Sequence, residues 1–270
     1  MSGPRSVKPA RKARLGQNFL VDPHAAERIV AALGAIGDRL VIEIGPGHGA
    51  LTRLLARTAG RLAAIEFDRG LAAELRDEFA KRENVEIIEA DVLRVDFSTL
   101  AGAGVGTKKA KVAGNLPYYI TTDILLKLWA SRNLIETMVI MVQREVAERI
   151  AGAPGTRDYG LLSVTAQLFC RVENLFTLPP EAFRPPPKVH SSVLRLTMED
   201  KSAALNVEAA PFLKFARSAF AQKRKTIANN LKREFPGIND ALEELEVRPD
   251  ARAEALTLEQ LAGLYQKLKD

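Results

Sequence analysis

The chain has 270 residues with 47% hydrophobic content, which is enough for one large domain with a substantial core and a smaller second domain. No segment approaches the roughly 18 uncharged apolar residues of a membrane span, and no apolar stretch follows the basic N-terminus, so we exclude a membrane or secreted protein and expect a cytosolic one. One cysteine and three histidines exclude an internal disulfide and offer no zinc-ligand spacing, whereas the net charge of +6 favours a polyanionic partner.

The N-terminal part of the chain changes from a basic segment to a regular pattern. Residues 1–14 contain five basic residues and no acid, and we expect them to form a flexible arm. Asp22 followed by Pro23 is typical of a helix start, and the apolar run that follows ends at Leu33, just before a glycine. One helix is therefore predicted before the first strand.

Short apolar runs then alternate with segments of helical spacing. Strands buried on both faces that alternate with helices indicate a doubly wound α/β sheet with right-handed crossovers. We predict that this sheet is mostly parallel and that its last strand is antiparallel. The predicted strands are 40–44, 62–65, 85–88, 111–113, 137–142, 171–176 and 189–197. The predicted helices between them are 50–58, 69–81, 122–131 and 161–169.

The character of the sequence changes near residue 203, where short amphipathic helices without strand patterns begin. Thr257 and Gln260 form a capping-box pattern at the start of the last helix. We predict a larger domain over 15–200 and a small helical domain over 203–270. Basic residues cluster in the small domain, and we interpret them as a nucleic-acid contact rather than a solvated helix face. The predicted RNA-binding residues are Arg217, Lys223, Arg224 and Lys225.

Polar or flexible groups follow three successive predicted strands. A Gly-x-Gly-x-Gly turn begins at Gly45 and departs from the Gly-x-Gly-x-x-Gly spacing of dinucleotide-binding folds. Glu66 follows the second strand, where a carboxylate can accept hydrogen bonds from both hydroxyls of a ribose. Asp91 follows the third strand, where it can accept from an adenine amine. The combination predicts a site for S-adenosylmethionine, with its methionine end over Gly45.

The segment from Asn115 to Tyr118 suits methylation of the exocyclic amine of a nucleobase. This amine donates its lone pair into the ring, so it attacks a methyl group only when acceptors draw both N–H bonds out of the ring plane. The Asn115 side-chain oxygen and a nearby backbone carbonyl are such acceptors. Pro117 stiffens the turn, and the ring of Tyr118 offers a face on which a flipped base stacks. The predicted catalysis is therefore positioning and electrostatics, without a general base.

Together these motifs resemble the ribosomal RNA adenine dimethyltransferases, over residues 14–268. Residues 16–20, 143–149, 183–193 and 220–226 also look like that family. The chain most resembles its bacterial small-subunit branch, which implies a Rossmann-like methyltransferase fold. The resemblance also implies transfer of two methyl groups to N6 of each of two adjacent adenines, in a hairpin near the 3′ end of 16S rRNA in the small (30S) ribosomal subunit. We expect a monomer without a metal ion that contributes to ribosome biogenesis.

The resemblance further implies individual site residues. The cofactor contacts fall on Asn18, Leu20, Gly45, Glu66, Asp91 and Asn115. The catalytic residues are Asn115, Leu116, Pro117, Tyr118 and Phe183. The two aromatic rings in this set would stack on the two faces of the target adenine. Core packing is the alternative interpretation of the second ring, at 183.

Other functions stay open at this point. The erythromycin-resistance branch of the family methylates an adenine of large-subunit rRNA and more usually has Ile where this chain has Leu116. A DNA adenine methyltransferase would share the chemistry, but no base-reading module is evident. The chain could also act chiefly as a non-catalytic assembly factor of the small subunit. A nicotinamide-dependent oxidoreductase is disfavoured by the glycine spacing.

Overall fold

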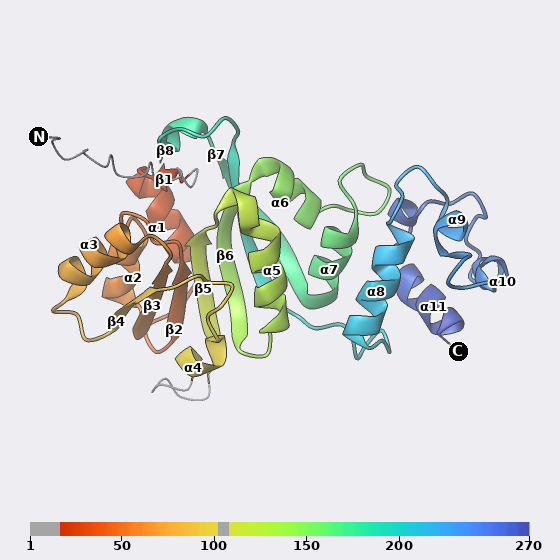
Figure 1. Ribbon diagram of the computed structural model, residues 1–270, viewed down its shortest axis with the longest axis horizontal. Coiled ribbons are helices and arrows are strands. Elements are labelled where there is room, and N and C mark those ends of the chain that lie inside the picture. Colours follow the sequence, from red (N-terminus) through yellow and green to blue (C-terminus); the bar gives the residue numbers. More distant parts are fainter. Residues whose placement is uncertain (1–16, 102–107, 270) are drawn as a thin grey trace, which may run out of the picture.

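The structure is a computed structural model that describes residues 17–101 and 108–269 (Figure 1). The predicted basic arm, 1–14, lies outside the described residues. A seven-stranded sheet with the strand order β4-β3-β2-β5-β6-β9-β7 forms the centre of the larger part of the molecule. Its strands are β2 (Leu40–Ile44), β3 (Arg61–Glu66), β4 (Val85–Glu89), β5 (Ala110–Asn115), β6 (Ile135–Gln143), β7 (Cys170–Leu178) and β9 (Ser191–Met198).

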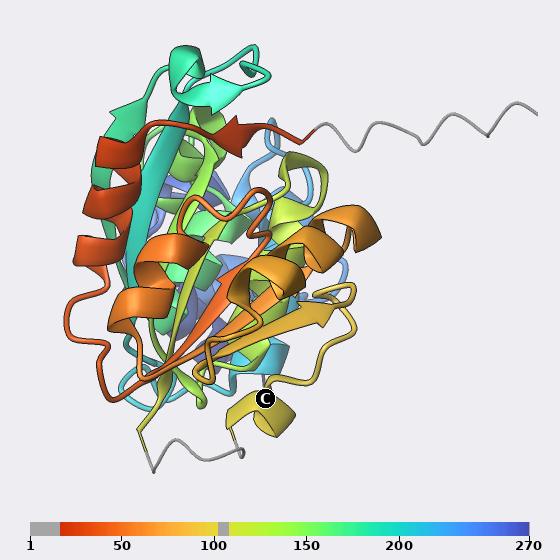
Figure 2. The same ribbon diagram turned by 90° about the vertical axis from the view of Figure 1, so that its left-hand side faces the viewer.

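The sheet is parallel from β4 through β6, and β9 is antiparallel to both of its neighbours, β6 and β7. The predicted mostly parallel sheet with an antiparallel last strand is confirmed. The prediction that its strands are buried on both faces is wrong for β4, which is one of the two edge strands and exposes Glu86 and Glu89. A separate two-stranded pair, β1 (Phe19–Leu20) with β8 (Phe183–Arg184), was not predicted and lies at the top of Figures 1 and 2.

Helices cover both faces of the sheet, because alternate strand residues point to opposite sides. The helices α1 (Pro23–Ala32), α2 (Thr52–Thr58) and α3 (Arg69–Phe79) share one buried cluster with residues of the sheet. The helices α4 (Phe97–Ala101), α5 (Thr121–Ala130), α6 (Arg144–Ile150) and α7 (Leu161–Phe169) belong to the other side. The predicted start of α1 is confirmed, since the Asp22 carboxylate accepts from the N–H of His24 at 2.9 Å.

The C-terminal part consists of the helices α8 (Ala209–Ala219), α9 (Ile227–Leu231), α10 (Ile238–Glu244) and α11 (Leu258–Leu268). The predicted capping box is present, with Thr257 and Gln260 each accepting from the backbone N–H of the other. Buried side chains of these helices belong to the same cluster as α5 and α7, so the predicted domain boundary near residue 200 crosses a continuous core. Within the described residues, no helix is both long and apolar enough to span a bilayer.

Candidate active site

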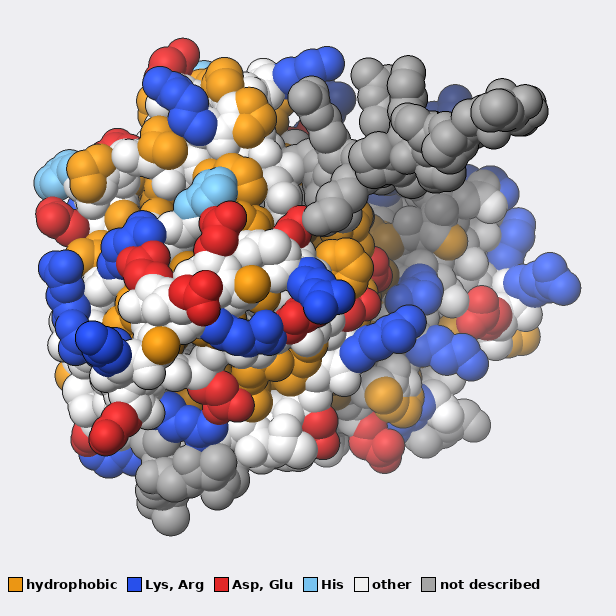
Figure 3. All heavy atoms as spheres, turned by 60° about the vertical axis from the view of Figure 1, so that its left-hand side comes forward, with side chains coloured by type: hydrophobic (Ala, Val, Ile, Leu, Met, Phe, Trp, Pro, Cys, Tyr) orange, Lys and Arg blue, Asp and Glu red, His pale blue; other side chains and the backbone are white. Residues whose placement is uncertain are grey.

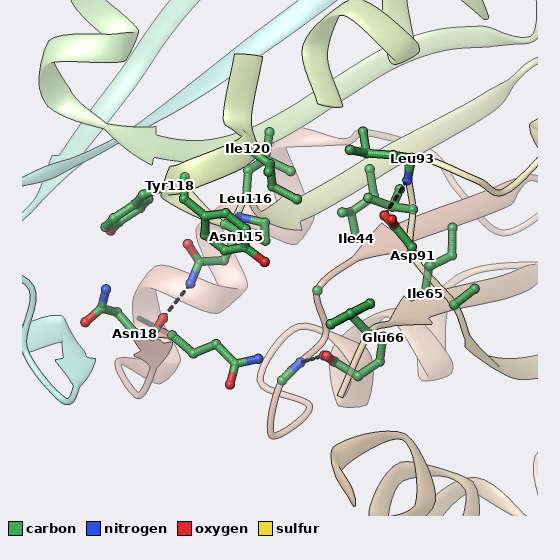
Figure 4. A pocket seen from close by; sticks show the side chains of 18 of the residues that line it. Asn18, Ile44, Ile65, Glu66, Asp91, Leu93, Asn115, Leu116, Tyr118 and Ile120 are labelled. Carbon is green, nitrogen blue, oxygen red and sulfur yellow. Dashed lines mark hydrogen bonds between the residues drawn. The ribbon is translucent and has the colours of Figure 1, made fainter. Parts of the chain in front are cut away.

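A cavity of about 380 Å³ opens at the carboxyl edge of the sheet, near the ends of β2, β3 and β5. Figure 4 shows Asn18, Asn115 and Tyr118 on one side of the cavity, with Glu66 and Asp91 on the other. Apolar walls with a few polar groups between them are typical of small-molecule sites. The apolar lining includes Phe19, Ile44, Ile65, Phe67, Ala90, Val92, Leu93, Leu116 and Ile120.

The glycine turn after β2 brings the backbone close to this cavity. Gly45 and Gly47 have φ angles of +66° and +57°, which strain any residue with a Cβ. A Cβ at Gly47 would also lie 2.7 Å from Cδ1 of Phe19, whose ring packs directly on the turn. The predicted helix start at residue 50 is wrong by two residues, because the turn delays α2 until Thr52.

Glu66 is buried at the end of β3 and lines the cavity. Its carboxylate oxygens accept from the backbone N–H groups of Gly47, at 3.0 Å, and Asp68, at 2.8 Å. A carboxylate has about four acceptor positions, so each oxygen retains one for a further donor such as a ribose hydroxyl. Glu66 thus fixes the glycine turn and can still bind a diol.

Asp91 lies on the loop after β4 and lines the same cavity. Its Oδ1 accepts from the N–H of Leu93 at 2.9 Å, which fixes the carboxylate while one third of the side chain (33%) stays exposed. Phe67 directly follows Glu66 and is not among the residues predicted from sequence. The residue is 59% exposed and lines the cavity, so it offers an apolar face to a ligand. A large apolar residue directly after the strand-end Glu66 is the sequence pattern that marks it.

Asn115 is the last residue of β5 and pairs with Met141 of β6, so the sheet itself positions it. Because pairing with β6 continues through Asn115, the strand is longer than the predicted 111–113. The Nδ2 of Asn115 donates to the carbonyl oxygen of Asn18 at 2.7 Å. Because a carbonyl oxygen only accepts, this bond fixes the orientation of the amide, and Oδ1 is the atom that can accept from a ligand amine.

The loop after β5 is held at several points. The N–H of Leu116 donates to a carbonyl of β6 at 3.0 Å, and the Thr121 hydroxyl donates to the Pro117 carbonyl at 3.0 Å. Tyr118 is half-buried, and its hydroxyl lies 2.7 Å from Oγ of Ser191. Burial raises the pKa of the Tyr118 phenol above its usual value, and the hydrogen bond to Ser191 partly opposes that shift. The phenol is therefore neutral at physiological pH.

Two predicted residues do not bring their side chains to the cavity. Phe183 is fully buried in β8, opposite Leu20 of β1, and both belong to the buried cluster on the α1 side of the sheet. The ring of Phe183 has no open face in this structure, as in the core-packing alternative. The side chain of Leu20 is buried as well, so its backbone is the part able to contact a ligand. Among the predicted catalytic residues, the cavity lining includes Asn115, Leu116, Pro117 and Tyr118.

Glu43 is a buried acid near the site that the sequence did not single out. It lies in β2, is 1% exposed, and lines a second cavity of about 30 Å³ with Gly45 and Gly47. Burial raises the pKa of Glu43 to about 8; the neighbouring Thr52 hydroxyl lowers it, and the charge of Glu66 adds to the increase. Glu43 is therefore mainly protonated at neutral pH, which limits the negative charge beneath the glycine turn.

The predicted RNA-binding residues are exposed on α8 and on the turn before α9. Lys223 donates to the carbonyl of Arg157, which ties this turn to the loop between α6 and α7. These helices occupy the opposite end of the molecule from α3 and β4, so the structure does not place the basic cluster in the cavity (Figure 1). At the end that carries α3 and β4, acidic and basic side chains are intermingled (Figure 3).

Comparison with known proteins places this site in a family. The sequence profile described as ribosomal RNA adenine dimethylase matches residues 9–270. The chain belongs to the ribosomal RNA adenine dimethylase family. It is 51% identical to a ribosomal RNA small subunit methyltransferase A from Koribacter versatilis, covering 100% of this chain and 98% of the relative. It is 55% identical to the protein of the same name from Acidobacterium capsulatum, covering 98% and 94%.

Solved structures agree on the fold. A dimethyladenosine transferase from Plasmodium falciparum has a TM-score of 0.81 at 24% identity, covering 93% of this chain and 97% of that protein. The 23S rRNA methyltransferase ErmE has a TM-score of 0.72 at 27% identity, covering 94% and 100%. The chain is therefore an rRNA adenine dimethyltransferase with a Rossmann-like methyltransferase fold. Enzymes of this family depend on S-adenosylmethionine, and the apolar walls and strand-end carboxylates of the cavity fit that cofactor.

Proposed function

We propose that the chain dimethylates N6 of two adjacent adenines in a hairpin near the 3′ end of 16S rRNA, within the small (30S) ribosomal subunit. Its high identity to proteins named small subunit methyltransferases supports this choice of RNA over 23S rRNA. The reaction contributes to ribosome biogenesis. We expect the enzyme to act as a monomer in the cytoplasm, where ribosomal subunits are assembled.

The orientation of Asn115 is the observation that carries this proposal. Its Nδ2 is bonded to the Asn18 carbonyl, so Oδ1 is the acceptor available to a substrate amine. When an adenine N6–H donates to Oδ1 and the other donates to a backbone carbonyl of the loop after β5, the amine turns out of conjugation with the ring. The lone pair is then localised on nitrogen, where it can attack a methyl group.

The cofactor is proposed to lie along the strand ends. Glu66 would accept from the ribose hydroxyls, Asp91 from the adenine amine, and Phe67 would pack on the adenine ring. The turn at Gly45 would hold the methionine end, together with Asn18. When bound, S-adenosylmethionine supplies an electrophilic methyl group, so that the new N–C bond forms as the S–C bond breaks and the amine loses its proton to water.

Tyr118 is proposed to stack on the flipped adenine. Stacking on an aromatic face is worth roughly 1–3 kcal/mol per base, which offsets part of the cost of removing the base from its helix. Arg217, Lys223, Arg224 and Lys225 would contact RNA phosphates away from the cavity and add affinity that does not depend on base sequence.

Transfer of labelled methyl from S-adenosylmethionine to unmethylated small subunits tests the proposal, with large subunits and DNA as parallel substrates and the product nucleoside identified by mass. We expect dimethyladenosine confined to 16S rRNA and about four methyl groups per subunit. Label in 23S rRNA would instead assign the chain to the large subunit. An unlabelled subunit that nevertheless binds the protein would favour a non-catalytic assembly role.

A further inference from the structure

The hydroxyls of Tyr118 and Ser191 form a hydrogen bond that joins the active-site loop to a distant strand. The two oxygens are 2.7 Å apart, although the residues are separated by 73 positions in sequence. Ser191 is the first residue of β9 and is fully buried. A buried hydroxyl that loses its partner is not readily compensated by solvent, so this bond constrains both side chains more strongly than a surface contact would.

Ser191 is a rigid attachment point. It pairs with Gln143 of β6 on one side and with Leu178 of β7 on the other, in the antiparallel part of the sheet. The residue before it, His190, is also fixed, because its carbonyl accepts from the N–H of Arg144 at 3.0 Å. The backbone of Ser191 therefore cannot move without disturbing three strands, which leaves its hydroxyl only rotation about χ1.

The other end of Tyr118 is fixed independently. The 3-10 turn Tyr118–Ile120 follows Pro117, whose carbonyl accepts from the Thr121 hydroxyl at 3.0 Å. The Tyr118 ring is thus attached at its Cα through the loop and at its hydroxyl through β9. A ring held at both ends cannot swing about χ1, so its position beside the cavity is set before any base arrives, whereas rotation about χ2 leaves the hydroxyl in place.

We propose that Ser191 is a positioning residue of the methyl-transfer site, whose hydroxyl holds the Tyr118 ring in the position that receives the target adenine. This inference rests on the proposed stacking of that adenine on Tyr118. The benefit is pre-organisation: a ring that need not be immobilised when the base enters loses less conformational entropy on binding. Ser191 itself touches neither substrate nor cofactor in this scheme and acts through Tyr118.

The next residue provides a matched control. Ser192 is also fully buried in β9, but its hydroxyl lies 3.1 Å from that of Thr177 in β7. Successive strand residues point to opposite faces, so Ser192→Ala removes an equally buried hydroxyl without touching Tyr118. Comparing Ser191→Ala with Ser192→Ala separates the positioning of Tyr118 from the general cost of losing a hydroxyl in this strand.

The test measures single-turnover methylation of small subunits and S-adenosylmethionine affinity for wild type, Ser191→Ala, Ser192→Ala, Tyr118→Phe and the Ser191→Ala/Tyr118→Phe double variant. We expect Ser191→Ala and Tyr118→Phe each to slow methyl transfer about tenfold, a loss typical of one buried hydrogen bond, and the double variant to be no slower than either. In these three variants the affinity for S-adenosylmethionine should stay within about twofold of wild type. For Ser192→Ala, both the methylation rate and this affinity should stay within about twofold of wild type.

The proposal would be overturned if the rate losses of the two single variants multiplied in the double variant. A wild-type rate for Tyr118→Phe would also overturn it, and this variant keeps the test valid even if Ser191→Ala folds poorly. A wild-type enzyme that methylates no RNA adenine would instead overturn the proposed function, and this inference with it.

Ring-labelled tyrosine NMR provides a readout without RNA. The chain has four tyrosines, so the spectrum contains few ring signals to assign. We expect Ser191→Ala to increase the motion of the Tyr118 ring and Ser192→Ala to leave it unchanged; an equally ordered ring in Ser191→Ala would contradict the proposal.

Discussion

The groups around the cavity are fixed by hydrogen bonds to the backbone, whereas the basic residues of the C-terminal helices are exposed. Glu66 and Asn115 each bond to main-chain atoms of segments far away in sequence. Arg217, Arg224 and Lys225 form no ion pair among the described residues and project into solvent. Methyl transfer requires groups placed to within about 0.5 Å, whereas attraction to phosphates acts over about 8 Å at physiological salt. Substitutions should therefore have steep effects at the cavity and gradual, salt-dependent effects at the basic surface.

The largest effect is expected for Asn115→Ala. This variant removes the acceptor that orients the amine in the transition state, a class of change that lowers kcat by roughly 10²- to 10³-fold. Single-turnover methylation at saturating S-adenosylmethionine checks it. Asn115→Asp should be similarly slow, because a carboxylate cannot donate to the Asn18 carbonyl. Activity within about tenfold of wild type in both variants would contradict the role given to Asn115.

A loss of cofactor affinity of about 100-fold is expected for Glu66→Gln, because charge-assisted hydrogen bonds contribute about 1.5–3 kcal/mol each and the amide cannot accept at both ends. Equilibrium binding of S-adenosylmethionine measures it. Glu89→Gln is the matched control, since Glu89 pairs with Glu66 across the β3–β4 register but is exposed and bonded to Arg76. Equal affinities for the two variants would remove Glu66 from the cofactor site.

Glu43 predicts a pH dependence of stability. Its pKa is raised from 4.5 to about 8 in the folded chain, so between these values the folded state binds more protons than the unfolded state. The free energy of unfolding should therefore fall as pH rises through this window, and level off above it. We expect Glu43→Gln to gain about 3 kcal/mol relative to wild type between pH 5 and pH 8, measured by urea unfolding. Parallel pH curves for the two proteins would contradict the buried, protonated state.

The smallest effect is expected at the basic surface. Replacing Lys223, Arg224 and Lys225 by Gln should weaken RNA binding about tenfold and reduce its salt dependence, because fewer counterions are released. The kcat at saturating subunits should be unchanged. Arg248→Gln with Lys267→Gln is the control, since these two cations are paired with Asp250 and Glu244 in the same helical part. A fall in kcat, or an equal loss in the control, would argue against a separate electrostatic surface.

Much of the site could be predicted because its chemistry is local in sequence. The glycine turn, Glu66, Asp91 and Asn115 each lie at or just after the end of a strand, and parallel strands bring their carboxyl ends to one edge. The contact between Asn115 and Asn18 could not be predicted, because the segment before α1 carries no regular pattern that places it beside β5. The burial of Phe183, which the sequence left as an alternative to stacking, could not be decided from sequence either. It depends on pairing between β1 and β8, two-residue strands too short to leave a pattern.

The sequence by itself determined the order of the seven strands of the central sheet, the α/β class and the residue types at each strand end, since these depend on local periodicity and turn chemistry. Tertiary structure alone decided which amide atom of Asn115 is available, which aromatic rings are open to a ligand, and that Ser191 holds Tyr118. The physical reason is that each of these depends on a hydrogen bond or packing contact between segments distant in sequence, whose partners become neighbours only when the sheet is assembled.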